Sequence, residues 1–197
     1  THEVLVLNGF YHSYIKHGEL PQGVILCGLN EASVRYPDLF SKHYGQYAET
    51  STDGLVALNT LLAQDGIFIY VPDNTRVEKP IQIINLCYSQ KNLRITNRNL
   101  IIAGDNASLK LVACDHTLSN QSFLNNSLTE IHTGRNTQVS CDWLQNENNL
   151  SAHISHMFIN QLSDSKFSST IVSLKGGLIR NNFYAVQKGS NAETNLN

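Results

Sequence analysis

Cys114 and His116 are the residues whose types and spacing come closest to a site for chemistry in this sequence. On a β-strand, residues two apart point to the same face, so the thiol and the imidazole lie together while Asp115 points the other way. Zinc and iron accept both ligands, but two protein ligands do not complete a metal site. We therefore expect this chain to bind no metal or cofactor. A buried thiol beside a hydrogen-bonded histidine is the simplest interpretation, with Cys114 and His116 as the candidate ligands otherwise.

The other histidines and cysteines do not predict a metal site either. His153 and His156 are three residues apart, so on a strand they point to opposite faces and do not bind one ion together. No C-x-x-C pair occurs, and reduced, buried thiols are the expectation for all four cysteines. Cys114 and Cys141 follow their turn glycines at different distances, so we expect them on opposite faces and not in one stacked ladder.

The sequence lacks the short motifs of common enzyme classes. It contains no phosphate-binding loop, no dinucleotide-binding fingerprint, no H-E-x-x-H and no G-x-S-x-G. We therefore predict no catalytic residues and a protein that is not an enzyme. A β-helical carbohydrate-active enzyme stays open as the alternative. It needs converging carboxylates and aromatic platforms, and Trp143 is the only tryptophan here.

Charge and hydropathy narrow the range of partners. Fourteen basic and sixteen acidic residues give a formal net charge of -2, and no run of Lys or Arg could follow a phosphate backbone. Nucleic acid is therefore not an expected partner. The longest apolar runs are far shorter than the roughly 20 residues that a membrane helix needs, and the N-terminus does not resemble a signal peptide. We expect a cytoplasmic protein that does not cross a membrane.

One phrase occurs three times and indicates the fold that positions these residues. A glycine, a variable residue and an asparagine precede an alternating segment at Gly104, Gly134 and Gly189, and the first two copies are thirty residues apart. Further short alternating segments, separated by Gly, Asn, Asp and Ser, indicate strands and no additional helix. A repeat of that length in an all-β region predicts a right-handed parallel β-helix with Asn and Gly at its corners. A β-sandwich is the alternative, because strands at this spacing also suit it.

A small α+β region over residues 1–66 is predicted to precede the β-helix of residues 67–197. Asn8-Gly9 indicates a hairpin turn, while Asn30 and Pro37 each suggest the start of a short helix.

The longest predicted helix covers residues 51–66. Its cap is one of three candidates, and Gly66 supplies its C-terminal end. A stripe of leucines is expected to pack on the following strand. The candidate caps are Ser51, Thr52 and Asp53, and the stripe consists of Leu55, Leu58, Leu61 and Leu62.

Three segments resemble the SufB/SufD family of iron–sulfur cluster assembly proteins. They are ALNTLLAQDGIFIYVPDNTRVEKPIQI from Ala57, NRNLIIAGDNASLKLV from Asn97 and GGLIRNNFYAVQKGSNAETNLN from Gly176. The resemblance runs from about Val4 to the end of the chain, with several motifs in order. The chain resembles SufD more than SufB, because it contains VLNGFYH followed by LPQGVILCGL. The family-motif positions to which we assign structural roles are Asn59, Asp65, Gly66, Pro72, Gly177, Arg180 and Asn181.

These structural roles follow from local chemistry. Asp65-Gly66 and Pro72 suit the end of a helix and the entry to a strand, and Arg180-Asn181 suits an ion pair and a turn at a corner of the β-helix. In each case a local reason is sufficient without a direct functional role.

The resemblance implies a β-helical subunit that works by protein–protein association. It implies a SufB-SufC-SufD-type complex that handles iron and iron–sulfur clusters, with SufD as a scaffold or iron-supply subunit. Pairing with a SufB-like paralogue, or with a second copy, would use the β-helix, and a SufC-like ATPase would bind a C-terminal part. Because GSNAETNLN ends inside an expected strand, we expect this chain to be an N-terminal piece that lacks this part.

Overall fold

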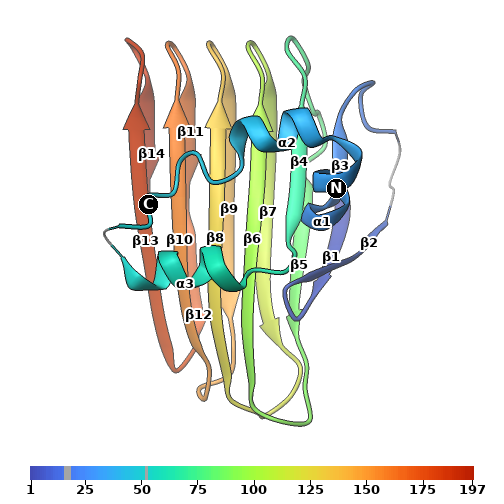
Figure 1. Cartoon of the computed structure of the whole chain (residues 1–197), viewed down its shortest axis with the longest axis vertical. Coiled ribbons are helices and arrows are strands. Elements are labelled where there is room, and N and C mark those ends of the chain that lie inside the picture. Colours follow the sequence, from blue (N-terminus) through green and yellow to red (C-terminus); the bar gives the residue numbers. More distant parts are fainter. Residues whose placement is uncertain (16–18, 52) are drawn as a thin grey trace.

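The computed structural model describes residues 1–15, 19–51 and 53–197, which form a parallel β-solenoid of about four turns behind a small helical region (Figure 1). The N-terminal elements are β1 (His2–Leu7), β2 (Phe10–Ile15), β3 (Ile25–Gly28), α1 (Leu29–Arg35), α2 (Pro37–His43) and α3 (Gly54–Leu62). The solenoid strands are β4 (Ile67–Val71), β5 (Ile81–Cys87), β6 (Leu93–Ala103), β7 (Ser108–Thr117), β8 (Phe123–Thr133), β9 (Gln138–Asn146), β10 (Ala152–Gln161), β11 (Lys166–Ser169), β12 (Ile171–Lys175), β13 (Leu178–Gln187) and β14 (Glu193–Leu196).

Two sheets form the walls of the solenoid. The eight-stranded sheet has the order β14-β11-β9-β7-β5-β1-β2, with β12 beside β9, and the six-stranded sheet has the order β13-β10-β8-β6-β4-β3. The solenoid strands pair in parallel from turn to turn, whereas β2 and β3 join their neighbours antiparallel. This pairing confirms the predicted parallel β-helix. The β-sandwich alternative is wrong, because that architecture is built from antiparallel sheets.

The lumen of the solenoid is filled by side chains that stack from one turn to the next. Ile69 pairs in register with Ile101, which pairs with Ile131, and Ile131 pairs with Ile159. All four are at most 2% exposed. Each such burial contributes roughly 1.5–3 kcal/mol, so the alternating pattern of the sequence is what holds successive turns together.

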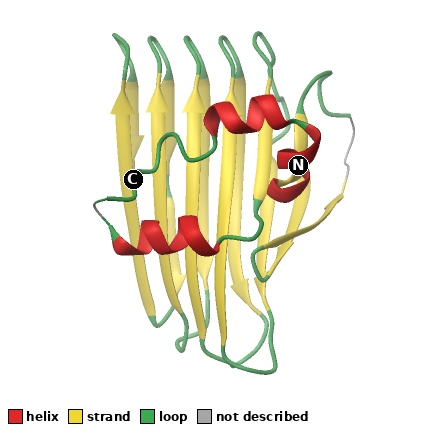
Figure 2. Cartoon of the chain, in the orientation of Figure 1, coloured by secondary structure: helices red, strands yellow, loops and turns green. Residues whose placement is uncertain are grey.

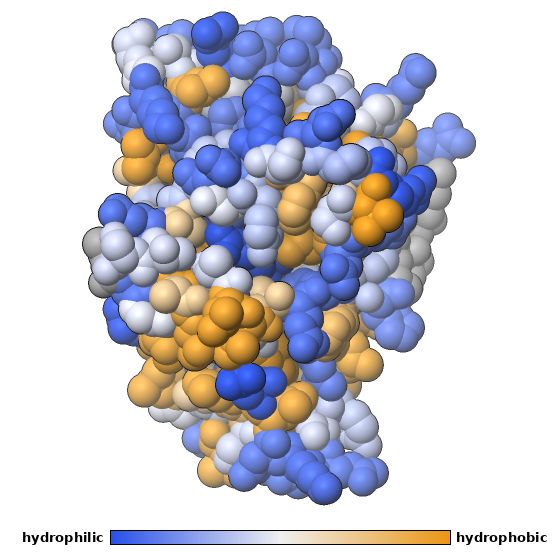
Figure 3. Space-filling view, in the orientation of Figure 1, coloured by the Kyte–Doolittle hydropathy of each residue, from blue (hydrophilic) through white to orange (hydrophobic). Residues whose placement is uncertain are grey.

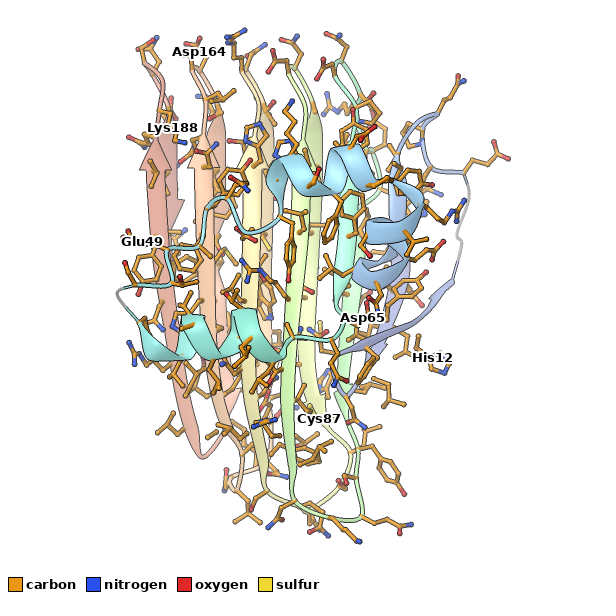
Figure 4. All side chains as sticks on the ribbon, in the orientation of Figure 1. His12, Glu49, Asp65, Cys87, Asp164 and Lys188 are labelled. Atoms are coloured by element: carbon orange, nitrogen blue, oxygen red, sulfur yellow. The ribbon has the colours of Figure 1, made fainter. Side chains whose placement is uncertain are left out.

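Left-handed residues mark one corner of every turn, as the sequence predicts. Asn106 Nδ2 donates to Asn74 Oδ1 at 2.9 Å, and Asn136 Nδ2 donates to Asn106 Oδ1 at 2.9 Å, across sequence separations of 32 and 30. Asparagine tolerates this conformation, and its side chain bonds to the copy above. Figure 4 labels Asp164 at this end of the strands. The corner residues with positive φ are Asn74, Asn106, Asn136, Asp164 and Asn191.

The corner glycines are needed for a different reason, the close approach of neighbouring turns. A Cβ atom on Gly104 would lie 2.2 Å from Asp73 Oδ1, and one on Gly134 would lie 2.6 Å from the backbone nitrogen of Asp105. Real Cβ atoms essentially never come that close to another atom. The G-x-N phrase therefore combines a glycine that lets turns pack with an asparagine that reverses the chain.

The three helices lie outside the solenoid, and α2 and α3 cross the face of the six-stranded sheet (Figure 2). Asp53 caps α3, because its Oδ1 accepts from the Leu55 backbone N–H at 2.8 Å. Thr52, the other candidate cap beside Ser51, lies outside the described residues. Pro37 opens α2 as predicted. Asn30 does not cap α1, which begins at Leu29 after Gly28.

Two expectations about α3 are wrong. The helix ends at Leu62 and not at Gly66, because Ala63 is already extended with ψ of 127°. The leucine stripe does not pack mainly on the following strand β4, because α3 lies on β6 and β8, and Leu55, Leu58 and Leu62 are only half-buried. Val56 and Asn59 are buried, whereas Leu61 is 80% exposed. Figure 3 shows an apolar surface in the region of α3. The helix lies on backbone carbonyls, which a polar Asn59 satisfies and a leucine does not.

Within the described residues, the structure contains no helix with the length and apolar character that a membrane span requires.

Candidate functional site

Cys114 and His116 lie on the outer face of β7, as their spacing predicts. The Cys114 thiol is 3.9 Å from Gln82 Nε2. Neither residue belongs to a group of three or more possible metal ligands among the described residues. His153 and His156 point to opposite faces of β10, because His153 contacts Ser127 and His156 contacts Asp53. All four cysteines are free and buried.

The structure brings together a different set of residues inside the lumen, the Asp–Glu–His cluster of Asp115, Glu147 and His153. Asp115 lies on β7 of one wall, Glu147 directly after β9, and His153 on β10 of the other wall. One ligand atom from each lies within 4.8 Å of the others. The three residues are at most 3% exposed. A carboxylate pair and an imidazole thus converge in a space closed to bulk water.

Hydrogen bonds fix the orientation of the cluster. His153 Nδ1 lies 2.7 Å from Glu147 Oε1 and 3.8 Å from Asp115 Oδ2, while His153 Nε2 lies 3.1 Å from Ser127 Oγ. Asp115 accepts from Asn85 Nδ2 at 2.7 Å. It also accepts from the indole N–H of the half-buried Trp143 at 2.9 Å. These bonds hold the His153 ring and the Asp115 carboxylate in place, and Glu147 is held through Oε1.

The electrostatics of the cluster are set by burial and by the opposed charges. Burial raises the pKa of Asp115, and the Glu147 charge adds to this rise, although His153 acts against it. Burial by itself lowers the pKa of His153, but the Glu147 hydrogen bond and the Asp115 charge outweigh it and raise the pKa. Opposite charges that face each other favour their ionised forms.

Sequence reasoning missed this cluster because its members are far apart along the chain. Asp115 lies on the face opposite Cys114, as its spacing predicts, but the spacing does not say what it meets there. The available signal was an acidic residue that follows Leu111 and Ala113 on the inward face of one strand. The pairing with Glu147 and His153 depends on how three turns stack, which the pattern of one strand does not contain.

A second buried polar group joins the N-terminal region to the solenoid. Arg98 and Glu130 form an ion pair of 2.8 Å with both side chains fully buried. Glu130 also accepts backbone N–H groups of Gly45, Tyr47 and Ala48 at 2.9 to 3.1 Å. The guanidinium lies 4.7 Å from the centre of the Tyr44 ring. These contacts fix the segment after α2 against the six-stranded sheet.

Asn59 and Asp65 occupy similar joining positions. Asn59 Nδ2 donates to the carbonyl oxygens of Asn97 and Asn126, both at 2.9 Å, which holds α3 on β6 and β8. Asp65 accepts from the backbone N–H groups of Tyr11 and Asn30 at 3.0 Å, and Figure 4 labels it between α3 and α1.

Gly66 and Pro72 flank β4. A Cβ on Gly66 would lie 1.9 Å from the carbonyl oxygen of Arg98, so a larger residue does not fit there. Pro72 directly follows the last residue of β4 and precedes the left-handed Asn74.

Gly177 lies where β12 passes into β13, and a Cβ there would be 2.4 Å from the Asn149 carbonyl oxygen. The prediction of a turn at Arg180-Asn181 is wrong. Both residues lie inside the extended strand β13, which pairs in parallel with β10. Arg180 Nη2 is 3.4 Å from Asp53 Oδ2, an ion pair of the kind expected. Asn181 accepts from Ser155 Oγ at 2.6 Å.

The carbohydrate-active alternative gains no support from the surface. A hollow of about 440 Å³ lies on the eight-stranded sheet, and Glu78 is the one carboxylate among its described lining residues. Cleavage of a glycosidic bond normally needs two carboxylates that flank the substrate. The paired carboxylates of the Asp–Glu–His cluster are buried in the lumen, where a sugar chain does not reach them.

Comparisons with known proteins agree with the motifs and the fold. The profile of the SufBD protein N-terminal region matches residues 1–83. The profile of the SUF system FeS cluster assembly SufBD core domain matches residues 86–197.

Similar proteins carry the same family name. A chloroplastic iron–sulfur cluster assembly SufBD family protein of Arabidopsis thaliana, ABCI8, is 30% identical over 128 residues, which cover 63% of this chain and 22% of the relative. A SufBD family protein of Staphylococcus aureus strain USA300 is 29% identical over 137 residues, 69% of this chain and 29% of the relative. The matched segments thus cover less than a third of the length of these relatives. With both family profiles matched in order, the chain belongs to the SufBD family of the iron–sulfur cluster assembly system.

Proposed function

We propose that this chain is part of a SufD-like, non-enzymatic subunit of a SufB-SufC-SufD-type complex that assembles iron–sulfur clusters. The observation that carries the proposal is the ordered match of both SufBD profiles along one chain. The fold is compatible with a scaffold, because the motif residues Asn59 and Asp65 hydrogen-bond to the chain's own backbone.

Within this proposal, the subunit supplies a rigid surface and takes part in iron supply, while a SufC-like ATPase hydrolyses ATP. A SufB-like paralogue or a second copy pairs with the β-helix. The ATPase binds a part of the protein outside residues 1–197. Iron or an iron–sulfur cluster is the cargo of the whole complex. The protein acts in the cytoplasm and needs no nucleic acid or membrane.

Co-purification tests the proposal. The full-length protein, expressed with a SufC-like ATPase and a SufB-like paralogue, is expected to retain both on an affinity column, whereas residues 1–197 alone are expected to lose the ATPase. Deletion of the gene is expected to lower the activity of an iron–sulfur enzyme in cell extracts, with recovery from the full-length gene. Strong ATPase binding by residues 1–197, or unchanged activity in the deletion strain, would contradict the proposed role.

A further inference from the structure

We propose that the Asp–Glu–His cluster binds one divalent first-row transition-metal ion in the lumen of the solenoid. The inference goes beyond the proposed function and does not depend on it, because it concerns residues inside one subunit and not its place in a complex. It starts from the convergence of Asp115, Glu147 and His153, whose ligand atoms lie within 4.8 Å of one another.

The first supporting observation is an unsatisfied oxygen. Glu147 is 1% exposed, and its Oε2 atom has no hydrogen-bond partner among the described residues. An ionised carboxylate oxygen without a partner in a buried site costs on the order of 1–3 kcal/mol or more. The other oxygen, Oε1, already contacts His153. A bound cation removes the cost by coordinating the free oxygen, which no neighbouring donor does.

The second observation is the charge of the site. Two carboxylates face one imidazole, and in the described part of the chain neither carboxylate has an ion pair with Lys or Arg. A protonated His153 balances the charge of only one of the two carboxylates that face it. The Arg98–Glu130 pair shows how this solenoid neutralises a buried acid elsewhere, with a guanidinium at 2.8 Å. At the Asp–Glu–His cluster that neutralising group is missing among the described residues, and a divalent cation supplies it.

The third observation is space beside the donors. A small cavity of about 20 Å³ touches Asp115, His153 and Ser127, with Cys87 on its wall. That volume accommodates about one water molecule, so one small additional ligand fits beside Asp115 and His153. Figure 4 labels Cys87 in the lower half of the solenoid.

The donor set selects the class of ion. Imidazole nitrogen combined with carboxylate oxygen suits zinc, iron and manganese and is a poor match for calcium, which prefers six to eight oxygens. The contact of His153 Nε2 with Ser127 Oγ at 3.1 Å leaves Nδ1 toward the carboxylates. Such outer hydrogen bonds are typical of histidine ligands. When the ion binds, Nδ1 loses its proton to solvent, and no redox step is involved.

Metal binding by the full-length protein tests the inference. The protein is unfolded in EDTA and refolded with Zn²⁺ or with Co²⁺, so that the ion reaches the closed lumen, and bound metal is then counted after gel filtration. We expect one ion per chain in the wild type and an affinity at least 100-fold lower in Glu147→Gln, which keeps the shape of the side chain. The matched control is the double variant Cys114→Ala/His116→Ala, which removes the outward-facing pair and is expected to bind normally.

Two further readouts keep the test decisive if Glu147→Gln does not fold. Asp115→Asn and His153→Gln are expected to lose the ion as well, and X-ray absorption of the wild type is expected to show one imidazole with oxygen ligands. A shell without an imidazole ligand would assign the ion to another site and overturn the inference. Wild-type protein that refolds without retaining Zn²⁺ or Co²⁺ above the Glu147→Gln level would also overturn it and would identify the cluster as a proton-sharing network.

Discussion

Glu130 shows how one side chain can join two parts of this protein. Its Oε2 accepts from two guanidinium nitrogens of Arg98 at 2.8 and 3.0 Å, and it also binds the backbone N–H of Gly45. Its Oε1 binds the N–H groups of Tyr47 and Ala48. Burial of a charged pair costs free energy, but the hydrogen bonds of this pair offset that cost. Removal of one partner leaves the other charge buried without compensation and therefore destabilises the protein.

The substitution Glu130→Gln tests whether the buried Arg98–Glu130 pair stabilises the protein. The change leaves the Arg98 charge buried without its counter-ion, and we expect the free energy of unfolding to fall by about 3–5 kcal/mol. Chemical denaturation followed by circular dichroism measures the loss. Glu78→Gln is the matched control, because Glu78 pairs with Arg76 at the exposed surface and such pairs contribute about 0–1 kcal/mol. Equal losses in the two variants would show that the buried pair is not the joint described here.

Two neighbouring histidines, His43 at the end of α2 and His132 on β8, predict how stability depends on pH. The rings of His43 and His132 lie 4.8 Å apart, and burial lowers the pKa of each to about 4. In the unfolded chain a histidine has a pKa of about 6.5. Between these values the unfolded state binds more protons than the folded state, so the free energy of unfolding falls as the pH drops from about 6.5 to about 4.

Denaturation curves at pH 7, 6 and 5 measure this dependence. His43→Gln is expected to flatten the decline, while substitution of the exposed His12 to Gln leaves it unchanged. A decline of the same steepness in both variants would rule out His43 as its source.

The Gly-x-Asn corners allow successive turns of the solenoid to pack closely. A pair of glycine substitutions tests this close packing. Gly134→Ala places a Cβ 2.6 Å from the Asp105 backbone, whereas nothing lies within 4 Å of a Cβ on Gly54 at the start of α3. Overpacking of this kind typically costs 1–3 kcal/mol, and we expect about 2 kcal/mol for Gly134→Ala. Gly54→Ala is expected to be neutral or slightly stabilising. Thermal unfolding compares the two, and a tolerated Gly134→Ala would contradict the close approach of turns.

The same corners explain how much of the fold could be predicted from the sequence. Asn106 and Asn136 follow a glycine in a repeated phrase, so both the corner and the period could be inferred. Asn74 has the same left-handed conformation but follows Pro72-Asp73. Because the glycine of the repeated phrase is absent there, this corner could not be inferred from the repeat. The hairpin at Asn8-Gly9 was predictable because both residues favour positive φ. Local turn chemistry thus specifies the corners in advance.

Contacts between turns could not be predicted in the same way. The Asp–Glu–His cluster and the bonds of Asn59 depend on the register of several strands, and a shift of one residue reverses every side chain. The buried face of α3 could not be predicted for a related reason. The face that a helix buries depends on the surface on which it packs, and α3 packs on the backbone carbonyls of Asn97 and Asn126.

At the scale of the whole molecule, α3 acts as a strap that crosses successive turns of the solenoid. Asn59 bonds to β6 and β8. Asp53, at the other end of α3, lies 3.3 Å from His156 on β10 and 3.4 Å from Arg180 on β13. In a simple solenoid each turn contacts only its neighbours, and stability is close to a sum of local terms. The strap adds a connection that runs along the stack.

Asp53→Ala tests whether the strap stabilises these turns together. The change removes the helix cap at the Leu55 N–H and both contacts to the solenoid, and loss of a cap alone typically costs about 1 kcal/mol. We expect faster amide hydrogen exchange in β10 and β13, with β5 and β7 of the opposite wall unchanged, measured by mass spectrometry. Asp53→Asn, which can keep the cap without the charge, is expected to give an intermediate effect. A uniform increase in exchange over both walls, or none in β13, would show that the turns do not depend on α3.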